Sequence, residues 1–94
     1  MIITFITFSC KDTELIWNGY ASKKFPSTIQ QTVRRKLVHI HAAISINDLR
    51  VPPGNRLEKL KGSDFHCVRV NDQWRIVFKW VHGKAFEVEI TDYH

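Results

Sequence analysis

The sequence lacks the short motifs that mark most metal and nucleotide sites. It contains no glycine-rich phosphate loop, no CxxC pair and no HExxH run, so nucleotide and zinc chemistry have little support. Its two cysteines, Cys10 and Cys67, lie far apart and outside any metal-ligand spacing. Such thiols, without a secretion signal, predict reduced packing cysteines in a cytoplasmic protein. We therefore expect neither a cofactor nor a metal.

The sequence also lacks a membrane-spanning run. The start, Met-Ile-Ile-Thr-Phe-Ile-Thr-Phe, is apolar but too short for a span. It also has neither the basic start nor the small-residue cleavage site of a secretion signal. Apolar residues alternate with Thr over Ile2–Thr7, which predicts a first β-strand.

The composition predicts a small basic globular domain. The 94 residues, 44% of them hydrophobic, suffice for one domain over residues 1–94 with one core. Lys and Arg number 14 against 9 Asp and Glu, a formal charge of +5. This field favours an anionic partner, either nucleic acid or an acidic protein. Charge alone leaves open a domain that is merely basic.

Two helices are expected in the first half of the chain. Lys11–Asn18 predicts a short helix ending at Gly19, and Ser27 with Gln30 forms a capping-box pattern that opens a longer one. Arg34-Arg35-Lys36 occupies the rest of this second helix, where such a run is usually a solvated face. Apolar residues recur at helical spacing, which predicts a buried stripe: Ile29, Val33, Leu37, Ile40 and Ile44.

The second half of the chain is expected to form a sheet. A helical turn over residues 45–49 and the break at Val51-Pro52-Pro53-Gly54 precede a strand over Arg56–Leu60. Three further alternating runs predict a meander, with connecting loops at residues 71–73 and 82–84. The expected order is β-α-α-β-β-β-β, an α+β domain with its helices on one face of a mainly antiparallel sheet.

Alternation assigns the strand residues to two faces. The core face should carry His66, Val68, Val70, Trp74, Ile76, Phe78, Trp80, Phe86, Val88 and Ile90. The opposite face should carry Arg69, Arg75 and Lys79, facing Glu87, Glu89, Thr91 and Tyr93. We expect function on this polar, basic face.

The histidines form no chelating pattern. His39 and His41 are two apart on a helix and so point in different directions, while His66 and Cys67 lie on opposite sheet faces. His82 is expected at a hairpin tip, in solvent. The terminal Asp92-Tyr93-His94 places three proton-transfer or hydrogen-bonding side chains beside Arg75, although a frayed polar end would look the same.

Three blocks of sequence closely resemble the HigB-type toxins of the RelE/ParE superfamily of bacterial toxin–antitoxin systems. These blocks are Arg50-Val51-Pro52-Pro53-Gly54-Asn55-Arg56-Leu57-Glu58-x-Leu60-Lys61-Gly62, Val68-Arg69-Val70-Asn71-Asp72-Gln73-Trp74-Arg75-Ile76, and Val88-Glu89-Ile90-x-Asp92-Tyr93-His94. The similarity runs through nearly the whole chain. The family fold, two helices on a small antiparallel sheet, agrees with the order derived above.

The resemblance implies a ribosome-dependent mRNA endonuclease that inhibits translation and arrests growth. It also implies a HigA-type helix-turn-helix antitoxin as partner, with promoter DNA bound only through the toxin–antitoxin complex. The implied catalytic residues are Lys61, Arg75, Asp92, Tyr93 and His94, and we expect Lys59, Arg69 and Lys79 to bind RNA. Two features differ from the family pattern: Glu58 stands where some branches have His, and only Ser63-Asp64 follows Gly62 before the next strand.

The chemistry of these residue types suits RNA cleavage without a metal. This reaction needs a base for the 2′-hydroxyl, cations for the phosphorane and an acid for the leaving 5′-oxygen. Arg75 would clamp the phosphate, and His94 would serve as acid or base. Lys61 would add charge or act as a base, Asp92 would orient His94, and Tyr93 would stack on a base or hold a phosphate. The alternatives are a ParE-like DNA gyrase inhibitor and a nucleic-acid-binding module without chemistry.

Overall fold

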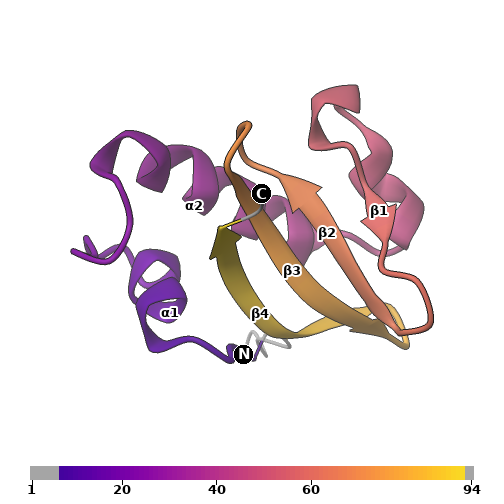
Figure 1. Ribbon diagram of the computed structural model, residues 1–94. Coiled ribbons are helices and arrows are strands. Elements are labelled where there is room, and N and C mark those ends of the chain that lie inside the picture. The colour runs from indigo at the N-terminus through magenta and orange to yellow at the C-terminus, as the bar shows by residue number, and fades with distance from the viewer. Residues whose placement is uncertain (1–6, 93–94) are drawn as a thin grey trace.

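The computed structural model describes residues 7–92 and shows two helices followed by a sheet (Figure 1). The predicted first strand, except Thr7, lies outside the described residues. The elements are α1 (Lys11–Trp17), α2 (Ser27–Ala42), the 3-10 helices η1 (Ile46–Arg50) and η2 (Pro53–Asn55), β1 (Glu58–Lys59), β2 (Phe65–Arg69), β3 (Trp74–Val81) and β4 (Lys84–Asp92). Across residues 7–92, no helix is both long enough and apolar enough to span a bilayer.

Within the described residues the sheet is antiparallel, and its four strands have the order β1-β2-β3-β4. The segment next to α1 pairs with β4: the amide of Val88 donates to the carbonyl oxygen of Thr7 at 2.8 Å, and the bridge between Phe8 and Val88 is parallel. One face of the sheet packs against the helices, which confirms the predicted α+β fold. The core contains Ile16, Ile29, Val33, Leu37, Ile40, Val68, Ile76, Phe78, Val88 and Ile90.

Helix α1 ends as predicted. Asn18 is the C-cap, and Gly19 follows with φ of +92°, a left-handed conformation that favours glycine. The predicted buried stripe of α2 holds as far as Ile40. Helix α2 ends at Ala42, so Ile44 lies beyond it and is 86% exposed. The prediction that Ile44 continues the buried stripe was wrong, because the chain leaves the helix before reaching it.

The predicted capping box at Ser27 is absent from α2, which begins after Pro26 with no side-chain cap. Gln30 instead reaches back to the preceding loop. Its Oε1 accepts from the amide of Ser22 at 3.1 Å, and its Nε2 donates to the carbonyl oxygens of Ser22 at 2.7 Å and Phe25 at 2.8 Å. Gln30 therefore fixes the connection between the helices, not the first turn of α2.

The β2–β3 connection matches the prediction, but the β3–β4 connection differs. His82 and Gly83, both with positive φ, form a tight turn between Val81 and Lys84. A bulge then follows between the pairs Lys79–Phe86 and Val77–Glu89, where Glu87 has φ of +52°. The extra residue in β4 compensates for the shorter turn and restores the predicted faces of Val88 and Ile90.

The bulge makes one face assignment wrong. Phe86 pairs with Lys79 and so shares the polar face, whereas Ala85 pairs with Trp80 and is buried. The predicted strand over Arg56–Leu60 is also shorter than expected. Only Glu58 and Lys59 form β1, and Arg56 before them has a left-handed conformation, with φ of +45°, that does not continue a strand.

Candidate functional site

The polar face of the sheet brings two arginines together. Arg75 lies opposite Arg69 on β2 and opposite Thr91 on β4, so the three side chains share one face. Adjacent guanidinium groups repel each other. An ion pair between Arg69 and Asp72 offsets part of this repulsion. This confirms the predicted placement of Arg69, Arg75 and Thr91 on one face.

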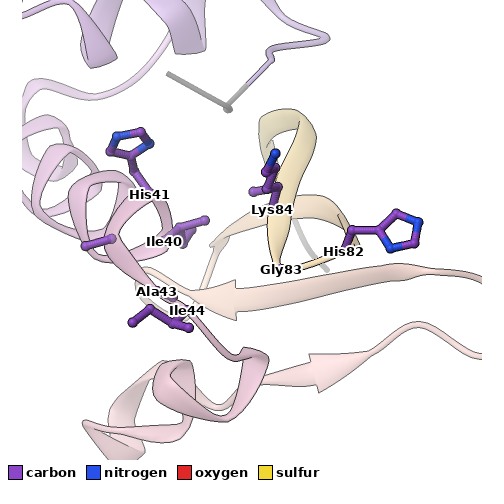
Figure 2. Close-up of a pocket in the computed structure, with 9 residues that line it drawn as sticks. Ile40, His41, Ala43, Ile44, His82, Gly83 and Lys84 are labelled. Carbon is purple, nitrogen blue, oxygen red and sulfur yellow. The ribbon is translucent and has the colours of Figure 1, made fainter. Parts of the chain in front are cut away.

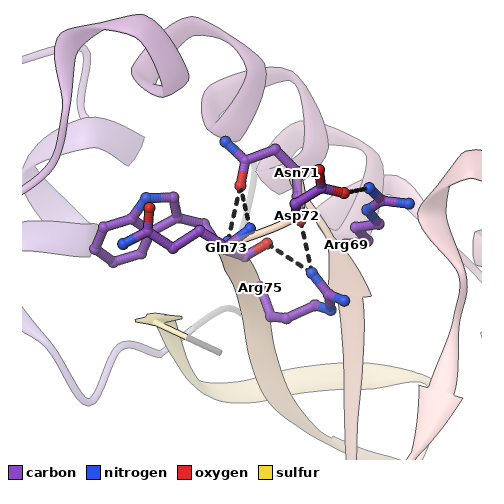
Figure 3. Close-up of polar contacts among 6 residues, drawn as sticks. Arg69, Asn71, Asp72, Gln73 and Arg75 are labelled. Carbon is purple, nitrogen blue, oxygen red and sulfur yellow. Dashed lines mark hydrogen bonds and ion pairs between the residues drawn. The ribbon is translucent and has the colours of Figure 1, made fainter. Parts of the chain in front are cut away.

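The 71–73 loop fixes the direction of the Arg75 side chain (Figure 3). The side-chain oxygen of Asn71 accepts from the amides of Gln73 at 2.9 Å and Trp74 at 2.8 Å, which closes the loop. Nη1 of Arg75 donates to the carbonyl oxygens of Asn71 at 2.7 Å and Trp74 at 3.3 Å. The guanidinium is thus held by main-chain atoms, an arrangement suited to a fixed cation in a binding site.

A hollow of about 480 Å³ opens beside this arginine, lined by Arg56, Leu57, Glu58 and Arg75. We call it the Arg75 hollow. Oε1 of Glu58 lies 3.8 Å from Sγ of Cys67. Burial raises the pKa of the Cys67 thiol, the negative charge of Glu58 raises it further, and the charge of Arg75 opposes the shift. The hollow therefore combines two arginines with one carboxylate, a combination able to bind a phosphate and accept a proton.

The predicted C-terminal group is described only in part. Asp92 pairs with Trp74, so it belongs to the opposite face of the sheet from Arg75. Its Oδ2 accepts from Nε2 of Gln73 at 3.1 Å, which ties the end of β4 to the β2–β3 loop. Tyr93 and His94 lie outside the described residues.

The lysines predicted for the site are spread over the sheet. Lys61 is exposed in the β1–β2 turn, at the opposite end of the sheet from the β2–β3 loop (Figure 1). Lys79 shares the polar face but lies four positions along β3 from Arg75, about 13 Å at ~3.3 Å per residue. Lys59 pairs with His66 and shares its face, opposite that of Arg75. The fold thus keeps Lys61 and Lys59 apart from Arg75.

Sequence reasoning missed Arg56 and gave Glu58 no role in the site. The register places Glu58 opposite Cys67, and therefore on the same face as Arg69 and Arg75. That position follows from alternation once the short pairing of β1 is known. Arg56 enters the hollow through its left-handed backbone conformation, which propensity does not predict for arginine.

Another hollow, of about 380 Å³, lies between the end of α2 and the β3–β4 turn (Figure 2). Its lining includes His41, Ile44, His82 and Lys84, and within residues 7–92 no carboxylate contributes to it. His82 is exposed at the hairpin tip as predicted, and Figure 2 shows its ring pointing away from His41. The imidazoles are thus not arranged as an acid–base pair. Between Thr7 and Asp92, no three His, Cys, Asp or Glu side chains gather into a metal-binding group.

Comparison with known proteins identifies the class. Residues 12–94 match the family described as the RelE-like toxin of the type II toxin–antitoxin system HigB. The chain belongs to this family of HigB-like toxins, which confirms the resemblance seen in the sequence.

Two relatives are similar to this chain over about two thirds of its length. Toxin HigB-1 of Vibrio cholerae is 47% identical over 62 residues, which cover 64% of this chain and 65% of that toxin. An uncharacterised protein of Haemophilus influenzae is 42% identical over 69 residues, which cover 71% of this chain and 68% of that protein. The match to the Vibrio toxin thus spans slightly less than two thirds of that protein.

Proposed function

We propose that this protein is the toxin of a type II toxin–antitoxin pair and that it cuts mRNA on the ribosome. Membership of the HigB-like family supports the toxin role. The single observation that carries the proposed chemistry is the Arg75 hollow, where Arg56 and Arg75 lie with Glu58. A gyrase inhibitor, which acts by binding a protein, needs no such combination of phosphate-binding cations and a proton acceptor.

The proposed reaction is an internal transfer at phosphorus. Glu58 accepts the proton of the ribose 2′-hydroxyl, and the 2′-oxygen attacks the adjacent phosphorus. Arg75 stabilises the negative charge of the phosphorane through its planar donors. The 5′-oxygen leaves with a proton, and the other product is a 2′,3′-cyclic phosphate. We assign the donation of this proton to His94, with Tyr93 orienting the RNA base. Asp92 lies on the opposite face of the sheet from Arg75, so we give it no part in this step.

The remaining basic residues are proposed to hold the RNA strand. Arg69 and Lys79 share the face of Arg75, so they suit phosphates on either side of the cut. Lys59 and Lys61 lie on the exposed first hairpin of the sheet, where a longer strand or the ribosome would meet them. Lys61 is therefore proposed as a binding residue, because its position in the hairpin turn separates it from Arg75.

The proposed partner is a HigA-type helix-turn-helix antitoxin in the cytoplasm. An acidic segment of this antitoxin would cover the basic face, since the chain carries a formal charge of +5. Promoter DNA would be bound only by the complex. Co-purification should succeed at low salt and weaken at high salt, because screening shortens the range of charge interactions.

Expression in bacteria, followed by mapping of transcript ends with and without ribosomes, tests the proposal. We expect growth arrest and cuts within translated codons. Arg75→Ala and His94→Ala should each lower cleavage about 10²- to 10³-fold, the usual cost of losing one transition-state donor. Lys23→Ala, at an exposed position in the connection between the helices, is the control and should remain toxic.

Two outcomes would overturn the proposed chemistry. If both Arg75→Ala and His94→Ala stayed fully toxic, the site would have to be abandoned. Intact transcripts with blocked DNA supercoiling would point to gyrase as the target.

A further inference from the structure

A second cationic hollow, of about 210 Å³, lies between α2 and the segment that follows η1. We call it the helix-side hollow; it is lined by Arg35, Lys36, His39, Pro52 and Asn55. Arg35 and His39 are four residues apart, so they project from the same side of α2. Of the described residues that line it, three carry basic nitrogens and none is acidic.

Lys36 is held at the inner wall of this hollow. Its ammonium group donates to Oδ1 of Asn55, which is only 2% exposed. Nδ2 of Asn55 donates to the carbonyl oxygen of Leu49 at 3.1 Å. Burial lowers the pKa of Lys36, and the neighbouring charge of Arg35 lowers it further. An anion in the hollow would favour the charged form of Lys36 and offset the repulsion between Lys36 and Arg35.

The nearby Asp48 carboxylate does not line the hollow. It accepts from the amides of Ile44 at 2.9 Å and Ser45 at 3.1 Å, which closes the capping box of η1. These bonds lower the pKa of Asp48, and the charge of His39 lowers it by a smaller amount. The carboxylate is therefore bonded to its own helix and is not among the residues that line the hollow.

The size and donors of the hollow indicate the class of ligand. Its volume is below the ~300 Å³ typical of sites for whole drug-sized ligands, which suits one small anionic group better than a nucleoside. Arg and Lys together are the usual protein donors for phosphate. The helix-side hollow therefore fits a single phosphate group.

The position of the hollow indicates where that phosphate comes from. Asn55 lines the helix-side hollow, and the next residue, Arg56, lines the Arg75 hollow. Consecutive Cα atoms are only about 3.8 Å apart, so one short segment of chain contributes to both. We propose that the helix-side hollow binds a phosphate group of RNA, next to the strand held in the Arg75 hollow. This inference rests on the proposed function.

The test measures binding of a labelled 2′-O-methyl RNA oligonucleotide, which lacks the reacting hydroxyl, at several salt concentrations. Arg35→Ala should weaken binding about tenfold, the cost of one charged hydrogen-bonding contact. It should also reduce the slope of log affinity against log salt by about 0.7, one phosphate of a single strand. The matched control is Arg34→Ala, which removes an exposed arginine from the same helix that lines neither of these two hollows. It should leave the slope unchanged.

A second arm repeats the measurement with message-free ribosomes. A loss confined to the oligonucleotide arm assigns the phosphate to the message, and a loss confined to the ribosome arm assigns it to ribosomal RNA. If Arg35→Ala equals the wild type in both arms, or if Arg34→Ala has the same effect, the inference is overturned. Cleavage of unmodified message by the wild type is recorded alongside. An Arg35 effect without cleavage would contradict only the proposed function, whereas cleavage without an Arg35 effect would contradict only the subsite.

Discussion

Replacing Gln30 with alanine should test what holds the connection between the two helices. One amide side chain makes three hydrogen bonds there, with donor–acceptor distances of 3.1, 2.7 and 2.8 Å. Two of them involve the main chain of Ser22, which is buried. In Gln30→Ala, the amide of Ser22 and the carbonyl oxygens of Ser22 and Phe25 lose this partner at buried positions that water reaches poorly.

The size of the effect follows from these contacts. Each hydrogen bond contributes about 0.5–1.5 kcal/mol net, and stranding a buried partner costs more. Three bonds, partly replaced by water, give an expected loss of about 2–3 kcal/mol in the free energy of unfolding. For a small domain this is a large share of a total stability of about 5–15 kcal/mol.

Urea denaturation followed by tryptophan fluorescence measures this loss. With a slope of about 1–1.5 kcal/mol per molar urea, the midpoint for Gln30→Ala should fall by about 2 M. The control is Gln31→Ala, which makes the same chemical change at the next, exposed position of α2. Equal midpoints for the two variants would refute the role assigned to Gln30.

Two further predictions concern pH and thiol reactivity. Burial is the main cause that lowers the pKa of His66 in the folded protein. Below about pH 6.5 the unfolded chain therefore binds a proton at His66 more readily than the folded protein does, and the free energy of unfolding decreases as the pH is lowered. In urea denaturation at several pH values, His66→Gln should lose less stability at acid pH than the wild type. His82→Gln, at the exposed hairpin tip, should lose as much as the wild type. An unchanged dependence of stability on pH in His66→Gln would contradict the role given to His66. Burial alone would raise the pKa of Cys10, but hydrogen bonds from Thr13 and other groups outweigh burial, so the net pKa is lowered. Cys67 is only 1% exposed, and its pKa is raised. A chromogenic disulfide reagent should therefore modify Cys10 first in the native protein, and equal rates at both thiols would count against this reasoning.

The helices and the faces of the central strands could be predicted because their signals are local. Helix α2 follows from apolar spacing, and the shared face of Arg69 and Arg75 follows from alternation across a loop of the right length. Phe86 was misplaced because a shorter turn and a bulge compensate for each other. The sequence gives no clear local signal for the turn or for the bulge. The bulge depends on a positive φ at Glu87, which residues other than glycine rarely adopt.

The candidate site was harder to predict than the fold. The position of Arg75 on the polar face could be predicted from the sequence because Arg75 lies within a regular strand. Glu58 and Arg56 depend on a short edge pairing and a left-handed backbone position, which arise from tertiary packing. Lys61 was grouped with Arg75 by resemblance, but the antiparallel path of the first hairpin carries it to the other end of the sheet.

The brevity of β1 limits how other chains can recognise this protein. An exposed sheet edge usually offers a ladder of main-chain donors and acceptors to an incoming strand. Here that edge consists of Glu58 and Lys59 alone, both charged, with a left-handed residue close before them and a turn soon after. Strand addition or edge-to-edge self-association at β1 is therefore discouraged. A partner that binds on this side must engage side chains, which makes its recognition depend on sequence and not on backbone pairing.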